Sequence, residues 1–161
     1  MWYNMKMEAE NKNIHKHSVH KILAHSYSVY FLFFLIGVFL DLVFNFEVFN
    51  SSVVMPLGFI LLLFGTFLIL WAQKTSRNLK KDIINKGTFC HGPYYFTRTP
   101  TNFGLFFLML GFGLIINALF VAFFALISFV VAKLTFLKKE EKILALKYGA
   151  PYLEYKKSVR F

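Results

Sequence analysis

The sequence predicts an all-α integral membrane protein that folds as a single domain. Of its 161 residues, 57% are hydrophobic, only 16% are charged, and 22 are phenylalanine. A soluble domain of this composition would have too little polar surface to cover itself. The apolar residues also gather in three long blocks, and the basic residues lie between or beyond those blocks. These observations place the chain in a lipid bilayer.

Each of the first two apolar blocks has the length of one membrane crossing. They cover residues 27–44 and 53–72. A helix rises ~1.5 Å per residue, so about 20 residues cross a hydrocarbon core of ~30 Å. The apolar core of the first block is too long for a cleaved signal peptide, and no small-residue cleavage pattern follows it. We therefore expect both blocks to be transmembrane helices.

The third apolar block, residues 103–132, is too long for a single crossing. Asn117 is the strongly polar residue inside it, at a position where a tight turn would divide the block into a hairpin. We expect the two helices of this hairpin to cover about residues 100–116 and 118–137. The prediction is thus four transmembrane helices, of which the third is short and the third and fourth form a hairpin.

The basic residues support this count, because Lys and Arg next to membrane helices stay on the cytoplasmic side. With four helices, all 18 Lys and Arg fall on one side, and residues 45–52 and the Asn117 turn contain none. The amino-terminal arm, residues 1–26, and the tail, residues 138–161, are then both cytoplasmic, and residues 27–161 form one membrane domain. A three-helix topology would instead place the segment from Lys133 onward, with its eight basic residues, outside.

The net charge of +10 indicates attraction to the anionic headgroups of membrane lipids, at about 1 kcal/mol per basic residue near the surface. Nucleic-acid binding is less well supported, since the lysines flank membrane helices, and no feature indicates an obligate protein partner. The single cysteine, Cys90, excludes an intrachain disulfide and a cysteine-based zinc site. Four histidines fit a polar arm better than a metal site: His15, His17, His20 and His25.

A polar segment, residues 87–99, separates the second predicted membrane helix from the third. Residues 74–86 before it have the spacing of a short interfacial helix. Gly92 and Pro93 favour a turn, and Pro100 disfavours helical geometry at the residue before it, so we expect an ordered non-helical loop. Irregular backbone at membrane depth is tolerated where it is buried in protein or lines a cavity. The segment is therefore either part of a site for a polar ligand or an ordinary cytoplasmic loop.

Two adjacent acids, Glu140 and Glu141, follow the predicted fourth helix among three lysines. A solvated run of charges is the usual meaning of such a sequence. Short connections, however, bring the end of the fourth helix beside the start of the third, and a carboxylate there would lie near the polar segment and hold a cationic group. Downstream, Gly149 and Pro151 mark the end of a helix in the tail.

Several further residues have a structural interpretation. Asp41 lies at the outer end of the first helix, where we expect its side chain to reach water. Tyr27, Tyr30 and Trp71 have the positions of interfacial anchors. Three glycines of the third helix either allow close helix approach or leave room for a substrate chain: Gly104, Gly111 and Gly113.

Two separated motifs carry a resemblance to a known family. The first consists of Gly92, Tyr94, Arg98, Pro100 and Gly104, at the spacing Gly-x-Tyr-x-x-x-Arg-His-Pro-x-Tyr-x-Gly. The second consists of Glu140 and Glu141, followed by Tyr148-Gly149, Tyr152, Tyr155 and Arg160. In these last 90 or so residues the chain resembles the isoprenylcysteine carboxyl methyltransferases and their bacterial and archaeal relatives, a group related to the phospholipid N-methyltransferases.

The resemblance implies an S-adenosylmethionine site on the cytoplasmic side, closed by the carboxy-terminal tail, and a lipophilic acceptor embedded in the membrane. It implies catalytic roles for Arg98 and Glu141. The residues that it implies for the cofactor are these: Lys86, Gly87, Thr88, Phe89, Tyr94, Thr99, Pro100, Thr101, Asn102 and Glu140. A carboxylate and tyrosine faces suit a sulfonium and an amino group, with about 0.5–2 kcal/mol for each cation–π contact.

The chain departs from the family pattern at three positions. Thr99 and Asn102 stand where the family has His and Tyr, and Phe136 stands where the eukaryotic enzymes have an arginine for the substrate carboxylate. Arg98 is a candidate substitute for that arginine. Two other functions stay open on these residues: an N-methyltransferase for phospholipids or other amines, and a non-catalytic scaffold or pseudoenzyme that binds anionic lipid.

Overall fold

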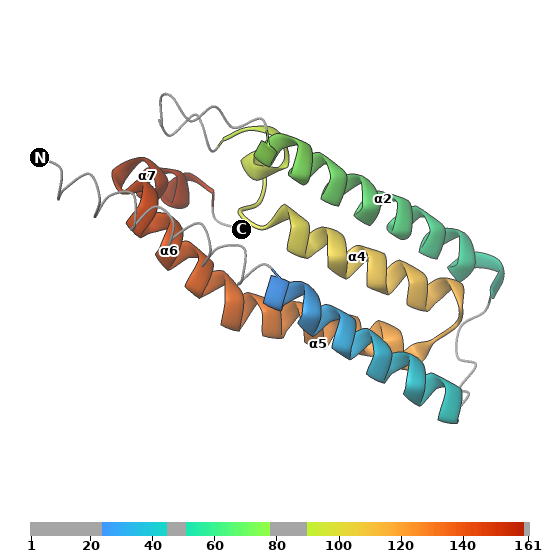
Figure 1. The fold of residues 1–161 in the computed structure, drawn as a ribbon. Helices are drawn as coiled ribbons and strands as arrows, with labels where there is room; N and C mark the ends of the chain where they lie inside the picture. Colours follow the sequence, from blue (N-terminus) through green and yellow to red (C-terminus); the bar gives the residue numbers. More distant parts are fainter. Residues whose placement is uncertain (1–23, 45–50, 78–89, 160–161) are drawn as a thin grey trace, which may run out of the picture.

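The computed structural model describes residues 24–44, 51–77 and 90–159 of the chain, and all regular structure in these three ranges is helical (Figure 1). In chain order the elements are the helix Ala24–Phe44, α2 (Ser51–Arg77), the 3₁₀ turn η1 (Gly92–Tyr95), α4 (Pro100–Ile115), α5 (Leu119–Ala132), the π-helical turn η2 (Lys133–Leu137), α6 (Lys138–Tyr148) and α7 (Ala150–Ser158). The predicted all-α class is confirmed for this part of the chain.

Three helices are long and apolar enough to cross a membrane, namely Ala24–Phe44, Val53–Ser76 and the continuous helix Leu119–Ala145. The remaining expected crossing, the third in chain order, is α4, which has 16 residues, a length of ~24 Å at ~1.5 Å per residue. Large apolar side chains cover the outside of the long helices, for example Leu42 at 77% exposure and Val53 at 75%. Such surfaces suit contact with lipid.

Two pairs of glycines bring α2 and α4 into direct backbone contact. A Cβ atom added to Gly58 would lie 2.8 Å from the carbonyl oxygen of Gly111, and one added to Gly65 would lie 2.7 Å from that of Gly104. The pairs run in opposite directions along the two helices, so α2 and α4 are antiparallel. Of the two interpretations of Gly104 and Gly111, the structure favours close helix approach, the usual packing mode of small residues in membrane helices.

The predicted hairpin turn at Asn117 is confirmed. Asn117 has φ 57°, a left-handed conformation that asparagine adopts more readily than most residues. The amide of Ala118 donates to the carbonyl of Gly113 at 2.7 Å, which closes the turn between α4 and α5. Gly113 lies against this turn as well, since a Cβ atom on it would lie 3.1 Å from the backbone nitrogen of Ala122.

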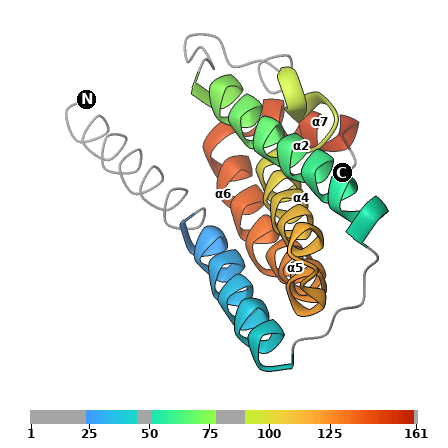
Figure 2. The ribbon, with the colours of Figure 1, turned by 90° about the vertical axis from the view of Figure 1, so that its right-hand side faces the viewer.

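The helix Ala24–Phe44 packs against both helices of the hairpin, and α2 lies against α4 (Figure 2). The rings of Phe33 and Phe124 stack at 5.7 Å between centroids, and those of Phe34 and Phe112 meet edge to face at 5.3 Å. The buried core of the bundle lies where these helices meet: Tyr30, Met109, Ala118, Val121, Ala125 and Ala132.

Asp41 stabilises the start of α5. One carboxylate oxygen accepts a hydrogen bond from the amide of Phe120 at 3.1 Å, and the other accepts one from the amide of Val121 at 3.0 Å. The first amides of a helix lack partners within it, and a carboxylate from another helix can replace the usual capping side chain. Asp41 thus binds backbone donors, a role that the sequence did not indicate, and its side chain is only partly exposed.

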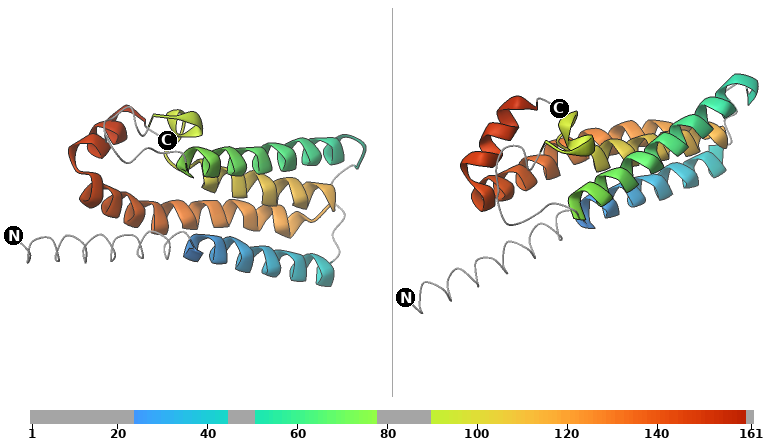
Figure 3. Two further views of the ribbon diagram at one scale, coloured as in Figure 1. Left: turned by 45° about the horizontal axis from the view of Figure 1, so that its top comes forward. Right: turned by 90° about the horizontal axis from the view of Figure 1, so that it is seen from above.

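Two helix ends differ from the sequence expectations. The second helix continues to Arg77, so the first residues of the expected interfacial helix 74–86 belong to α2, whereas residues 78–86 lie outside the described part. The fourth helix continues through η2 into α6 and ends at Tyr148. Gly149, with φ 62°, then reverses the chain, and Figure 3 shows α7 folded back toward η1.

Candidate functional site

Segments far apart in the sequence meet at the end of the bundle where α7 folds back. The segment 90–99, which includes η1, lies against the end of α2, and the first turn of α4 follows it directly. On the other side, α6 and α7 form an angle whose inner face carries Tyr152, Tyr155 and Val159. We use the name loop–tail site for the region formed by segment 90–99, the first turn of α4, the helices α6 and α7, and the start of the helix Ala24–Phe44.

Gly92 and the two prolines shape the loop. Gly92 has φ 58°, and a Cβ atom on it would lie 2.5 Å from Oγ1 of Thr75 and 3.2 Å from Nε1 of Trp71. Both the backbone angle and the contact with α2 therefore require glycine. Pro93 and Pro100 are fully buried. The expected turn at Gly92 is confirmed, but the segment is not wholly non-helical, because residues 92–95 form one 3₁₀ turn.

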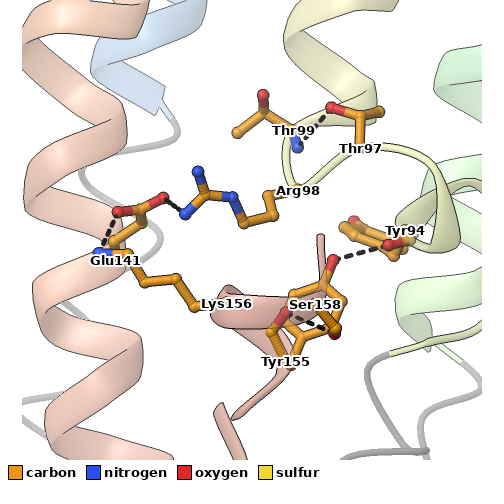
Figure 4. Close-up of polar contacts among 8 residues, drawn as sticks. All are labelled: Tyr94, Thr97, Arg98, Thr99, Glu141, Tyr155, Lys156 and Ser158. Carbon is orange, nitrogen blue, oxygen red and sulfur yellow. Dashed lines mark hydrogen bonds and ion pairs between the residues drawn. The ribbon is translucent and has the colours of Figure 1, made fainter. Parts of the chain in front are cut away.

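A single carboxylate joins the loop to the tail (Figure 4). Glu141 on α6 pairs with Arg98 of the loop and, through its other oxygen at 2.7 Å, with Nζ of Lys156 on α7. Glu141 is only 9% exposed. Among the described residues these are the two ion pairs, and both end on Glu141. Because one buried carboxylate binds both cations, the positions of loop and tail depend on each other.

A second connection lies beside the first. The hydroxyl of Tyr155 on α7 donates to the backbone carbonyl of Tyr94 in η1 at 2.7 Å (Figure 4). Tyr155 and Tyr152 are both about 3% exposed, and they pack with Cys90, Tyr94, Leu144, Ala145 and Tyr148. Burial raises the pKa of both phenols, and for Tyr152 the nearby Glu141 and Glu140 carboxylates raise it further. The tail therefore covers the loop with an aromatic layer.

The phenol of Tyr94 shows where Glu140 lies. Its pKa is raised to about 12, mainly by burial and further by the Glu140 carboxylate and Tyr27, whereas hydrogen bonds with the side chains of Ser76 and Thr101 lower it. Glu140 thus lies within electrostatic reach of Tyr94. Tyr27 of the first helix and Tyr152 of α7 also lie within electrostatic range of Glu140, so tyrosines from three elements act on one partly buried acid.

The structure brings together most of the described residues that the sequence singled out. Arg98 and Glu141 form an ion pair, Tyr94 and Thr101 are hydrogen-bonded, and the amide of Thr99 donates to Oγ1 of Thr97 at 3.3 Å. Arg98, the candidate substitute for a substrate-binding arginine, binds Glu141. Four predicted cofactor residues lie outside the described residues: Lys86, Gly87, Thr88 and Phe89.

The sequence did not predict the contribution of the first helix to the loop–tail site. Tyr30 was expected at the membrane interface, but it is 4% exposed, and its hydroxyl donates to Oδ1 of Asn102 at 2.7 Å. The ring of His25 lies 6.0 Å from that of Phe136 on η2. A tyrosine among apolar residues near a helix end has the same pattern whether it faces headgroups or protein. A polar partner 72 residues away in the sequence gave no local signal.

Metal ligands do not gather in the described residues, where no group of three or more His, Cys, Asp or Glu side chains is placed to hold an ion. The histidines His15, His17 and His20 lie outside that part. In comparisons with known proteins, no family model matches the chain, and no curated protein or solved structure matches it.

Proposed function

We propose that the chain is an S-adenosylmethionine-dependent membrane methyltransferase of the isoprenylcysteine carboxyl methyltransferase-like kind, which acts on a lipophilic acceptor in the membrane. The observation that carries the proposal is the position of Glu140. Its side chain is partly buried and within electrostatic range of tyrosines from three elements, and no basic side chain of the described residues forms an ion pair with it. A carboxylate beside aromatic faces attracts an organic cation.

The donor set suits the cofactor. S-adenosylmethionine supplies a methyl group on a positively charged sulfonium and carries an ammonium on its amino-acid end. Glu140, Tyr94 and Tyr27 would bind these charges, whereas Thr101 and Asn102 offer hydroxyl and amide groups to its polar atoms. The protein's own contribution to a displacement of this kind is alignment of the reactants and exclusion of water. The tail, which Tyr155 and Lys156 attach to the rest of the site, would help to exclude water.

Membrane topology belongs to the same proposal. Four crossings, with α4 as the short third one, would leave the loop–tail site and both termini on the cytoplasmic side. The distribution of basic residues supports this arrangement, since the turn at Asn117 contains no Lys or Arg and the segment from Lys133 onward contains eight. A site at this depth would receive a lipophilic acceptor from the bilayer and a water-soluble cofactor from the cytoplasm.

A specific observation favours an amine as the acceptor over a carboxylate. Arg98 and Lys156 are both bound to Glu141, and Phe136 contacts His25 where the eukaryotic enzymes have an arginine. An amine must lose a proton during the reaction, whereas a carboxylate need not. For an N-methyltransferase the rate would fall on the acid side, near the pKa of the acceptor.

The test of cofactor binding is calorimetric titration of S-adenosylmethionine and S-adenosylhomocysteine into detergent-purified protein. We expect micromolar binding, about −8 kcal/mol, that Glu140→Gln and Tyr94→Ala both weaken. Glu154→Gln is the matched control, because Glu154 is an exposed acid on α7 and its change should leave the affinity unaltered. Absence of binding to folded wild-type protein would reject the methyltransferase and favour a scaffold that binds anionic lipid.

A further inference from the structure

The contact between Tyr30 and Asn102 fixes one side of an amide group. The Tyr30 hydroxyl lies 2.7 Å from Oδ1 of Asn102 and 3.4 Å from its backbone carbonyl oxygen. Tyr30 belongs to the buried core of the bundle, so its ring has little freedom to move. With Oδ1 engaged by a buried hydroxyl, the two N–H groups of the Asn102 amide are the donors that the side chain offers to a ligand.

This amide belongs to the same turn of α4 as a residue that binds Tyr94. Asn102 follows Thr101, whose side chain is hydrogen-bonded to Tyr94. The Glu140 carboxylate in turn raises the pKa of Tyr94. The first turn of α4 thus combines an amide donor with a nearby cluster that attracts positive charge. An α-amino acid end has the complementary pair of charges, because one carbon atom carries both its ammonium and its carboxylate. Glu140 and tyrosine faces suit the ammonium, and amide N–H groups suit the carboxylate.

We propose that Tyr30 is a positioning residue that holds the Asn102 amide with its donors available to the carboxylate of S-adenosylmethionine. This inference rests on the proposed function and adds to it the orientation of the cofactor, with its amino-acid end at the first turn of α4. Without the Tyr30 hydroxyl the amide is free to rotate, and its carbonyl oxygen then repels the carboxylate in part of the molecules.

The experiment compares S-adenosylmethionine with its decarboxylated analogue, which keeps the sulfonium and the amine but lacks the carboxylate. Asn102→Asp preserves an acceptor for Tyr30 and replaces the amide donors by negative charge. We expect the affinity of Asn102→Asp for S-adenosylmethionine to fall by about tenfold to a hundredfold, the range for a lost hydrogen bond to a charged group. Its affinity for the decarboxylated analogue should stay within about twofold of the wild-type value.

Tyr30→Phe tests the positioning role itself, because it removes the hydroxyl and keeps the ring. We expect a loss of about fivefold for S-adenosylmethionine and no loss for the decarboxylated analogue. Tyr95→Phe is the control, since Tyr95 is 64% exposed and its change should affect neither ligand. Thermal unfolding of every variant checks that it is folded, and Asn102→Ala replaces Asn102→Asp if the aspartate prevents folding.

Equal losses for the two ligands, or no loss for either, in folded Tyr30→Phe and Asn102→Asp would overturn the positioning role, while the proposed function would stand on the wild-type affinity. If wild-type protein binds neither ligand, the proposed function fails and this inference fails with it. A loss confined to the ligand that carries the carboxylate supports both.

Discussion

The two ends of the helical bundle each contain a carboxylate in a largely apolar setting, and they use it differently. At one end, Asp41 accepts hydrogen bonds from two backbone amides of α5. At the other end, Glu141 binds two side chains, Arg98 from the loop and Lys156 from the tail. Backbone amides at a helix start are fixed in place, whereas long side chains from separate segments can rearrange. The first carboxylate therefore caps a helix, and the second joins the loop to the tail beside Glu140.

The largest expected effect is the loss of the Glu141 carboxylate. Glu141→Gln would remove the negative charge that pairs with Arg98, whose side chain is 16% exposed, and breaking one side of a buried pair costs about 3–5 kcal/mol. Reversible unfolding of the detergent-solubilised protein in denaturant measures this change in the free energy of unfolding. Glu154→Gln serves as the control at an exposed acid of the tail. A change of Glu141→Gln no larger than that of the control would contradict the assigned pairing.

Alkaline pH should weaken the loop–tail site by a comparable amount. The pKa of Tyr94 is raised from 10.0 to about 12, so between these values the unfolded chain has lost the phenol proton and the folded chain keeps it. Stability from this group is complete below pH 10 and falls by about 1.4 kcal/mol per pH unit up to about pH 12.

The raised pKa values of Tyr152 and Tyr155 act in the same direction. Phenolate absorbance during an alkaline titration, with the unfolding free energy measured in parallel, checks the sign. In the variant Tyr94→Phe the slope between pH 10 and pH 12 should decrease. Stability that stays constant or increases over that interval would contradict the burial of these phenols.

Asp41→Ala should have a smaller effect, confined to stability. It removes the cap of α5, and loss of a helix cap costs about 0.5–2 kcal/mol. The unfolding free energy should fall by this amount, and the affinity for S-adenosylmethionine should not change, because Asp41 lies at the opposite end of the bundle. Weaker ligand binding by a folded Asp41→Ala protein would show that the two ends are not independent.

The smallest expected effect is that of Lys156→Met. The side chain of Lys156 is 43% exposed, and Arg98 still binds Glu141 when the lysine is lost, so we expect less than about 1 kcal/mol. Lys157→Met is the control at the neighbouring exposed position. Limited proteolysis of the tail offers a second measurement, with faster cleavage expected for Lys156→Met than for Lys157→Met. Equal cleavage rates would show that the ion pair of Lys156 does not help to hold the tail, and that of these two contacts only the Tyr155 hydrogen bond does.

Much of the helical fold was predictable, because its causes are local. Apolar length gave the long helices, and Asn117 gave the turn between α4 and α5. Helix ends were predicted less well, since α2 extends to Arg77 and the helix after α5 extends to Tyr148. The extension of α2 is polar, and the extension after α5 mixes charged with apolar residues. Such residues form a helix or a loop, and contacts with other segments determine which of the two forms.

The site was predictable where its residues lie close in sequence or in the two motifs. Arg98, Glu141 and Tyr94 were all singled out, and the structure places them together. The contributions of Tyr27, Tyr30 and Asp41 were not found. Each depends on how the helix Ala24–Phe44 packs against α4 and α5, and a sequence pattern gives the apolar face of a helix without giving its neighbour.

We propose that one end of the bundle binds S-adenosylmethionine through Glu140, whereas Asp41 at the other end stabilises the fold. The most direct test titrates S-adenosylmethionine calorimetrically into wild-type protein, Glu140→Gln and Asp41→Ala under the same conditions. We predict micromolar binding by wild-type protein and Asp41→Ala, and binding at least about tenfold weaker by Glu140→Gln, as for a lost contact with a charged group. Undetectable binding by folded wild-type protein, or equal affinity in Glu140→Gln, would contradict the claim.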